Sequence, residues 1–506
     1  MWLERVMTFE PNHPEQMVIV LLMAACVLSV NPGPMSFLLL GAVGAALCFT
    51  KINVGIFFLS AALIASVSVL PAGRLRKVGC YLLVGAMAAG PIALMHHFLS
   101  AWARGFCLLG IIAGVSVMLA AMHAKVDLPN EVRALRFISI GAAAMAILIG
   151  VAAKADGVSF RTLVNAVVVL PLSQPGIFAI AFVLPKAMAG IVLVLAACIA
   201  RLYYWVPERG PHAGWVDVLK CVAGLLVIAL LVRRGISISG IRSFGFAITY
   251  ALLPLALLPR KGGSWEASEF FPRIFVTALA AMEILQAYPV AGSQVNIGAG
   301  PFLLWGFMCV YDGTGGLLEL FPEMKDWQVP VAEVSMIGAV VLAAVVFAMS
   351  RHGFLRASYP NPASSLQGTS SLHLAPELEA GFETLSSDIQ TNCKVLFTMP
   401  GMGGFNFWSG VPTPDGFNMD AWMRAVPLGE QQQTLEELES NPSACVLVRR
   451  EDLAIWGVAE GGVDTLPLAH YIDYDMPIVF NDWGYEIHVS PQRPQAWVER
   501  ASVVKP

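Results

Sequence analysis

The sequence predicts an all-α polytopic membrane domain followed by a small soluble domain of the α/β or α+β class. Of its 506 residues, 57% are hydrophobic and only 13% are charged. A soluble globular protein does not need that much apolar surface. The charge is also uneven: residues 1–350 hold 22 Lys and Arg against 16 Asp and Glu, whereas residues 351–506 hold 9 against 19. A basic membrane region therefore precedes an acidic domain of ordinary size.

Apolar runs in the first 350 residues predict the membrane helices. A full span needs about 20 apolar residues, so the shorter runs indicate broken or re-entrant helices within a total of roughly ten to twelve. Two basic stretches, 71–77 and 231–242, are predicted to be cytoplasmic because cytoplasmic loops are rich in Lys and Arg. The runs are 17–30, 35–50, 52–70, 78–95, 105–122, 137–153, 175–200, 214–232, 244–258, 271–287, 298–310 and 331–350.

The remainder of the chain is predicted to be a linker, 351–375, and a soluble domain, 376–506. The linker is rich in Ser, Pro and Gly. In the soluble domain a helix is expected to start with Pro in its first turn, and β-branched and aromatic runs indicate strands. The expected helical segments are 376–390 and 420–442, and the expected strands lie in 393–401, 444–451 and, as a strand–turn–strand unit, 477–491.

The stretch Met282–Gln294 is the best candidate site. Glu283 follows a long apolar run, and an ionisable residue in a spanning segment is a functional-site hypothesis. A polar loop at membrane depth is tolerated where it lines a cavity or lies within protein. Glu283 is therefore a candidate catalytic acid or base, and an interfacial loop with an aromatic anchor is the alternative. The candidate substrate-binding residues of this loop are Gln286, Tyr288, Ser293 and Gln294.

Further candidates lie nearer the amino terminus. Lys51 and Asn53 separate two apolar runs. The lysine either extends to the membrane interface or faces a polar cavity, where it would bind the phosphate of a lipid headgroup. Glu10 precedes the first apolar run and is a second candidate catalytic acid. The alternative for Glu10 is a solvated segment that leads into a helix starting at Pro14.

In the soluble domain the most unusual stretch is 398–414, which combines glycines with Phe405, Phe407 and Trp408. Trp408 is a candidate for stacking on a sugar ring, and packing of this stretch onto the membrane domain is the alternative. The phosphate-binding Gly-rich pattern and the nucleophile elbow of hydrolases are absent from the sequence. Nucleic acid is excluded as a partner because the soluble part is acidic.

The cysteines do not predict a metal site, because the sequence has no Cys-x-x-Cys or Cys/His spacing. We therefore expect no cofactor, and a divalent cation remains an alternative. Cys393 and Cys445 stand alone in the acidic domain. They either form a disulfide, if that domain is outside the cytoplasm, or are buried thiols.

Three segments together resemble bacterial multi-spanning glycosyltransferases of the GT-C class: FTKINVGIF (49–57), LQAYPVAGSQ (285–294) and TMPGMGGFNFWSG (398–410). The resemblance covers most of the chain from about residue 9. It implies a multi-pass enzyme of the bacterial plasma membrane with an extracytoplasmic C-terminal domain. It also implies that Lys51 is similar to a phosphate-facing lysine and that Gln286–Gln294 is a loop near the donor headgroup.

The resemblance further implies a polyprenyl-phosphate-linked sugar as donor and a glycan, lipid or protein as acceptor, with membrane lipid around the enzyme. An acid takes the proton of the attacking hydroxyl group, and cations or polar donors stabilise the departing phosphate. The family places this acid in a long loop after an opening span, and here only a short segment precedes the first run. A truncated or inactive relative is therefore one expectation. A non-enzymatic transporter or flippase of lipid-linked glycans is a second, and a surface-polysaccharide polymerase or ligase is a third.

Overall fold

The computed structural model divides the chain into two compact units, Met1–Ser350 and Arg351–Pro506. The residues that the structure describes are 15–99, 102–127, 133–173, 184, 186–205, 214–234, 241–258, 264–289, 298, 300–318, 323, 338, 361–369, 373–414, 428–451 and 466–493.

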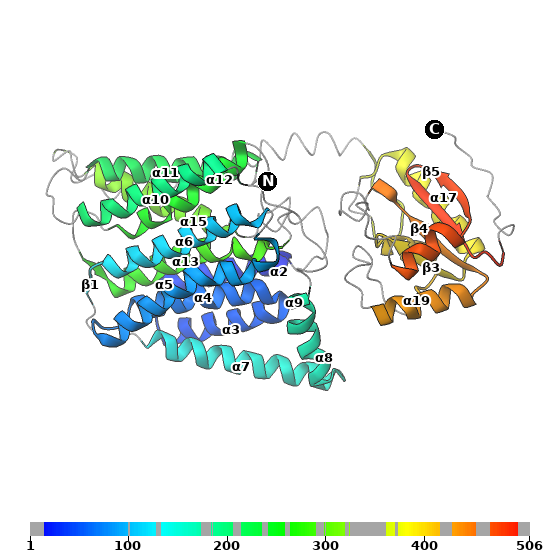
Figure 1. Cartoon of the computed structure of the whole chain (residues 1–506), viewed down its shortest axis with the longest axis horizontal. Helices are drawn as coiled ribbons and strands as arrows, with labels where there is room; N and C mark the ends of the chain where they lie inside the picture. Colours follow the sequence, from blue (N-terminus) through cyan, green and yellow to red (C-terminus); the bar gives the residue numbers. More distant parts are fainter. Residues whose placement is uncertain are drawn as a thin grey trace. The chain divides into compact units, whose positions relative to one another are not determined.

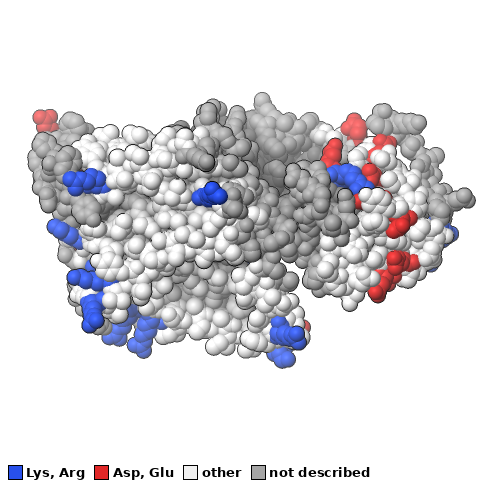
Figure 2. Space-filling model, in the orientation of Figure 1, with Lys and Arg blue, Asp and Glu red and all other residues white. Residues whose placement is uncertain are grey.

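The N-terminal unit is a bundle of apolar helices (Figure 1). Among the described residues, five helices are long and apolar enough to cross a membrane, and shorter apolar helices accompany them. The side of this unit seen in Figure 2 carries few charges along the helices. These features are typical of a helical membrane protein, whereas the total of ten to twelve helices stays a prediction. The helices in the described part of this unit are α2 (Glu15–Val30), α3 (Pro34–Thr50), α4 (Ile52–Ser68), α5 (Arg74–Leu94), η1 (His96–Phe98), α6 (Ala103–His123), α7 (Ala134–Ala155), α8 (Phe160–Val164), η2 (Asn165–Val169), α9 (Leu170–Ser173), α10 (Lys186–Trp205), α11 (Gly214–Arg234), α12 (Ile241–Leu252), η6 (Leu253–Leu257), α13 (Ala267–Met282), η8 (Leu285–Ala287) and α15 (Gly300–Leu318).

The bundle has two distinct ends. At one end, α3 turns into α4 at Lys51, and Asn53 donates a hydrogen bond to the Gln286 carbonyl oxygen. At the other end, two short strands pair in parallel, β1 (Val126–Asp127) with β2 (Trp265–Glu266). We call these the Lys51 end and the β1 end. Because α4 and α13 run antiparallel between them, Glu283 lies at the Lys51 end.

The two basic stretches predicted to be cytoplasmic lie at opposite ends of the bundle. Stretch 71–77 comprises the end of the α4–α5 connection and the first turn of α5, at the β1 end. Helix α11 packs antiparallel to α15, with Asp217 facing Gly316 and Gly224 facing Gly306. Since α15 begins close to Glu283, α11 ends at the Lys51 end, and the described residues 231–234 of the second stretch lie there. Stretches at opposite ends of a membrane-spanning bundle lie on opposite sides of the membrane, so in such a bundle only one of the two can be cytoplasmic.

The C-terminal unit is built around a four-stranded sheet of order β3-β4-β6-β5. Strands β3 and β4 are parallel, and β6 is antiparallel to both β4 and β5. Central strand β4 is buried at every residue, as expected for a strand covered on both faces. The elements are α17 (Pro376–Asn392), β3 (Val395–Met399), α18 (Gly403–Ser409), α19 (Leu428–Ser440), β4 (Ala444–Val448), α21 (Pro467–His470), β5 (Ile478–Asp482) and β6 (Tyr485–Val489).

Part of the predicted linker packs onto this unit. Ser364 and Ser365 donate hydrogen bonds to the Glu379 carboxylate on α17, and Leu366 and Thr369 are buried. Residues 361–369 therefore belong to the folded C-terminal unit rather than to a free linker. Serine and proline in a sequence indicate irregular backbone, and they do not show whether that backbone is anchored.

The Gly-rich stretch 398–414 contains helix α18. Asn406 donates hydrogen bonds to the carbonyl oxygens of Leu396 and Val411, and Gly410 ends the helix in the left-handed conformation. Phe405 is buried among neighbouring rings. Burial of the aromatic side chains therefore outweighs the low helix propensity of Gly403.

Candidate functional site

A buried acid stands at the Lys51 end of the bundle. Glu283 directly follows α13, and its side chain is fully buried. Neither carboxyl oxygen has a hydrogen-bond partner among the residues that the structure describes. Buried polar groups are almost always paired, so a buried carboxyl group without such a partner is a candidate for ligand contact or proton transfer.

A cation and an amide group accompany this acid. Lys51 lies at the same end of the bundle, near enough to Glu283 for its positive charge to act on that carboxyl group. Lys51 is the single residue between α3 and α4, and its N–H donates to the Leu47 carbonyl oxygen at 2.7 Å. The Asn53 Nδ2 atom lies 2.8 Å from the Gln286 carbonyl oxygen and joins the start of α4 to η8. The structure therefore brings together Glu283, Lys51, Asn53 and Gln286, which are far apart in the sequence.

Three aromatic rings form the next layer of this corner. Tyr288 is almost fully buried, with its ring centroid 6.0 Å from that of Trp102 and 6.2 Å from that of Phe98. Phe98 in turn stacks on Trp102 at 5.7 Å. Aromatic faces of this kind bind apolar chains and the C–H faces of sugars. The Tyr288 hydroxyl has no hydrogen-bond partner within the described part of the chain. We call Glu283, Lys51, Asn53, Gln286, Tyr288, Phe98 and Trp102 the Glu283 corner.

The remaining predicted site residues are not part of this corner. Glu10, Ser293 and Gln294 lie outside the described residues. Trp408 belongs to the C-terminal unit, where it stacks on Phe382 at 5.6 Å and donates its indole N–H to the Gln367 carbonyl oxygen. Trp408 thus has packing partners within its own unit.

Sequence reasoning missed a second polar group, a buried ion triplet nearer the β1 end. Arg273 on α13 binds both Asp312 carboxylate oxygens, at 2.6 and 2.8 Å. The Lys220 Nζ atom lies 3.2 Å from the same carboxylate and 2.7 Å from the Leu258 carbonyl oxygen. Trp265 covers the Arg273 guanidinium group at 4.5 Å. The available signal was the presence of charges within or next to the apolar runs of α11, α13 and α15.

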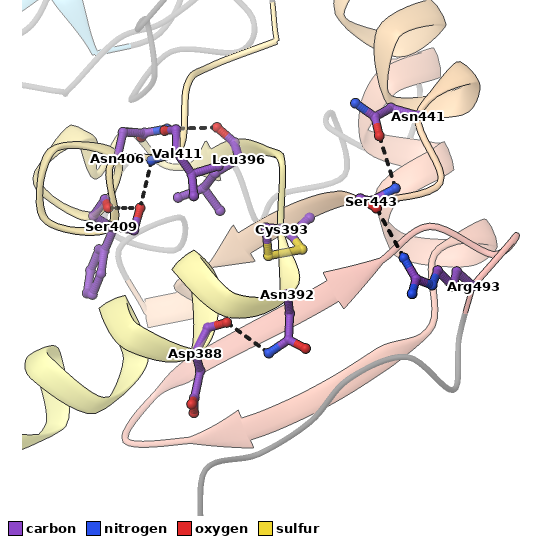
Figure 3. Close-up of a disulfide and its surroundings, with 12 residues drawn as sticks. Asp388, Asn392, Cys393, Leu396, Asn406, Ser409, Val411, Asn441, Ser443 and Arg493 are labelled. Carbon is purple, nitrogen blue, oxygen red and sulfur yellow. Dashed lines mark hydrogen bonds between the residues drawn. A yellow bond between two sulfur atoms is a disulfide. The ribbon is translucent and has the colours of Figure 1, made fainter.

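The C-terminal unit contains a disulfide between Cys393 and Cys445 (Figure 3), whose Cα atoms are 5.7 Å apart. Cys393 directly precedes β3, and Cys445 lies in the neighbouring strand β4. Both residues are buried. Of the two states considered for these cysteines, the structure contains the disulfide.

Among the described residues, no group of three or more His, Cys, Asp or Glu side chains could hold a metal ion. A divalent cation held in part by other residues of the chain stays a prediction. No protein-family model, curated protein or solved structure matches the chain. The apolar helices indicate a helical protein of the membrane type. A smaller unit with a mixed sheet and helices follows them in the chain.

Proposed function

We propose that this protein is an integral membrane glycosyltransferase that uses a polyprenyl-phosphate-linked sugar as donor. The observation that carries the proposal is the Glu283 corner. There a buried carboxyl group, a lysine and three aromatic rings meet at one end of an apolar bundle. Such a transferase needs a carboxylate for the acceptor, a cation for the phosphate, and apolar faces for the sugar or the prenyl chain.

In this mechanism the acceptor hydroxyl oxygen attacks the anomeric carbon of the sugar. The bond between that carbon and the phosphate oxygen breaks, and polyprenyl phosphate leaves with the electron pair. Glu283 takes the hydroxyl proton, and Lys51 stabilises the negative charge of the leaving phosphate. The acceptor is a glycan, a lipid or a protein.

The test uses the purified full-length chain in liposomes with a radiolabelled polyprenyl-phosphate sugar and a crude acceptor glycan fraction. Glu283→Gln removes the base and keeps the shape, so transfer should fall by about 10²–10⁴-fold while donor binding is retained. Lys51→Met should instead weaken donor binding by about tenfold, the loss expected for one charge-assisted hydrogen bond.

A matched control is Glu269→Gln, which makes the same change in the first turn of α13, at the β1 end. This variant should retain transfer. Equal activity of Glu283→Gln and Glu269→Gln would overturn the assignment of Glu283, and the acid would then be sought at Glu10. Equal loss of donor binding in both variants would indicate a general defect of α13.

We infer that the C-terminal unit is extracytoplasmic and that the protein resides in the bacterial plasma membrane. The disulfide Cys393–Cys445 supports this location, because structural disulfides persist in oxidising compartments and are rare in the cytosol. A membrane-impermeant protease added to intact spheroplasts should cleave the C-terminal unit. Protection of that unit until the membrane is permeabilised would place it in the cytoplasm.

A non-enzymatic transporter or flippase for lipid-linked glycans is the second candidate. The ion triplet Lys220–Arg273–Asp312 favours it, since charged residues inside a membrane bundle often mark substrate or ion pathways. Movement of a fluorescent lipid-linked glycan across liposome bilayers, without sugar transfer, would favour this function.

A further inference from the structure

Helix α7 ends abruptly, and the chain changes direction within a few residues. Gly157 adopts a positive φ of 87°, a conformation that suits glycine, and the Val158 N–H donates to the Ala153 carbonyl oxygen at 2.9 Å. Ser159 then caps the next helix by accepting a hydrogen bond from the Thr162 N–H at 3.0 Å. The local sequence therefore ends helix α7 and starts the next helix.

The segment that follows, 160–173, is helical through α8, η2 and α9. Figure 1 shows α8 and α9 running across the end of the bundle, at the end opposite β1. Helix α7 has 22 residues, about 33 Å at 1.5 Å per residue, which matches the roughly 30 Å hydrocarbon core. The segment therefore begins where a spanning α7 leaves the hydrocarbon.

Segment 160–173 is apolar, yet much of it is exposed. Phe160 is 78% exposed and Leu172 is 76% exposed, and Val164 and Val169 are also exposed. Globular proteins rarely leave contiguous apolar side chains of this size in water. The segment is also too short to span a bilayer, since its longest apolar helical stretch is Phe160–Val169.

The start of this segment is amphipathic. Phe160, Leu163 and Val164 are spaced three and four residues apart and share one helix face. Arg161 and Asn165 are exposed and lie on one flank of the helix, each about 100° around the axis from the apolar residue that precedes it. A helix with one apolar face and a basic, polar face is typical of segments that lie in the plane of the membrane surface.

We propose that segment 160–173 is an interfacial helix that lies flat in the lipid headgroup region. It inserts Phe160 and Val164 among the acyl chains, and it presents Arg161 to lipid phosphates. The occupant of its apolar face is bilayer lipid, because the second half of α7 exposes the apolar side chains Ile147, Leu148 and Val151 before the exposed Lys154 and Asp156 mark its end. The segment thus marks the membrane surface at the Lys51 end, whatever reaction the Glu283 corner performs.

The test is a nitroxide depth scan of the full-length protein in liposomes of phosphatidylcholine and phosphatidylglycerol. Single cysteines are introduced by Phe160→Cys, Arg161→Cys, Val164→Cys and Asn165→Cys into a chain whose free cysteines are replaced by alanine. Collisions with oxygen, which concentrates in lipid, are compared with collisions with a water-soluble nickel chelate. Ile147→Cys in the middle of α7 gives the reference for the hydrocarbon centre.

We expect the accessibility of the labels to oxygen and to nickel to alternate along the segment. The ratio of oxygen collisions to nickel collisions is at least threefold higher for labels at 160 and 164 than for labels at 161 and 165. The depth of the labels in the bilayer does not increase steadily from 160 to 165. A steady deepening from 160 to 165 would mean that the segment dips into the bilayer, and it would overturn the proposal. High nickel access at all four positions, or shielding from both reagents, would overturn it too, by indicating a water-exposed segment or a protein-covered one.

Discussion

At the scale of single residues, Glu379 shows how one carboxylate anchors an irregular segment. Its Oε1 atom accepts hydrogen bonds from the Ser364 hydroxyl at 3.0 Å and from the Ser365 hydroxyl at 2.8 Å, in addition to the Ser365 N–H. The Ser365 N–H and the serine hydroxyls hold the pKa of Glu379 below its ordinary value of 4.5. The ionised form therefore stabilises the folded state.

This interaction predicts a pH dependence. A carboxyl group whose folded pKa is lowered stabilises the fold fully above its unfolded pKa, and this stability is lost as the pH falls through the folded pKa. Glu379→Gln should therefore lower the unfolding temperature of the full chain at pH 7, and the difference from wild type should shrink below pH 4.5. The tryptophan fluorescence of the full chain follows the unfolding, and Glu377→Gln, on the same turn of α17, is the control. A pH-independent difference would contradict the role of ionised Glu379.

At the scale of elements, the ion triplet joins α11, α13 and α15. Asp312 has no exposed surface. Its single negative charge neutralises only one of the two positive charges that contact it. Removing one partner of a buried ion pair leaves an uncompensated buried charge, which costs about 3–5 kcal/mol. Asp312→Asn should therefore strongly lower the unfolding temperature in detergent, as measured by size-exclusion chromatography after heating. Asp156→Asn, the same change at an exposed residue, should have little effect.

Glycines set the distance between α3 and α7. A Cβ atom at Gly141 would overlap the Leu38 carbonyl oxygen, and one at Gly41 would overlap the Ile138 carbonyl oxygen. In contrast, a Cβ atom at Gly150, on the same helix, meets nothing within 4 Å. Because alanine favours a helix over glycine by about 1 kcal/mol, Gly150→Ala should be neutral or stabilising.

Gly141→Ala should instead destabilise the bundle by about 1–3 kcal/mol, the usual cost of overpacking. The thermal stabilities of the two variants in the same detergent provide the comparison. If Gly141→Ala were as stable as Gly150→Ala, α3 and α7 would not be in backbone contact.

At the scale of the whole molecule, the two units differ in the state of their cysteines. The chain has nine cysteines. Two of them are paired in the C-terminal unit, and the seven in the N-terminal unit are free. Under denaturing conditions a maleimide reagent should add seven labels before reduction and nine after it, as read by mass spectrometry. Nine labels without reduction would show that both C-terminal cysteines are thiols.

Loss of this disulfide should affect only the C-terminal unit. The bond closes a loop of 52 residues, and chain-entropy arguments assign such a crosslink about 4 kcal/mol. Cys445→Ala should therefore lower the unfolding temperature of the C-terminal unit, as reported by its tryptophan fluorescence. Protease resistance of the N-terminal helices should stay unchanged in the same sample.

The sequence by itself determined the division into an apolar unit and an acidic mixed unit, because hydrophobicity and charge are local properties of the chain. It also located α17, β3, β4 and the hairpin β5–β6, whose patterns are local. It selected Glu283, Lys51, Asn53, Gln286 and Tyr288 separately, from their polarity between apolar runs.

Only the tertiary structure decided which of these residues meet. The approach of Asn53 to Gln286 depends on the antiparallel packing of α4 and α13, and the ion triplet depends on three helices that are not adjacent in the sequence. The same packing decided that the two basic stretches lie at opposite ends, and the pairing of β3 with β4 decided that Cys393 meets Cys445. Such contacts follow from how helices and strands pack across long stretches of chain, and no local pattern of residues encodes them.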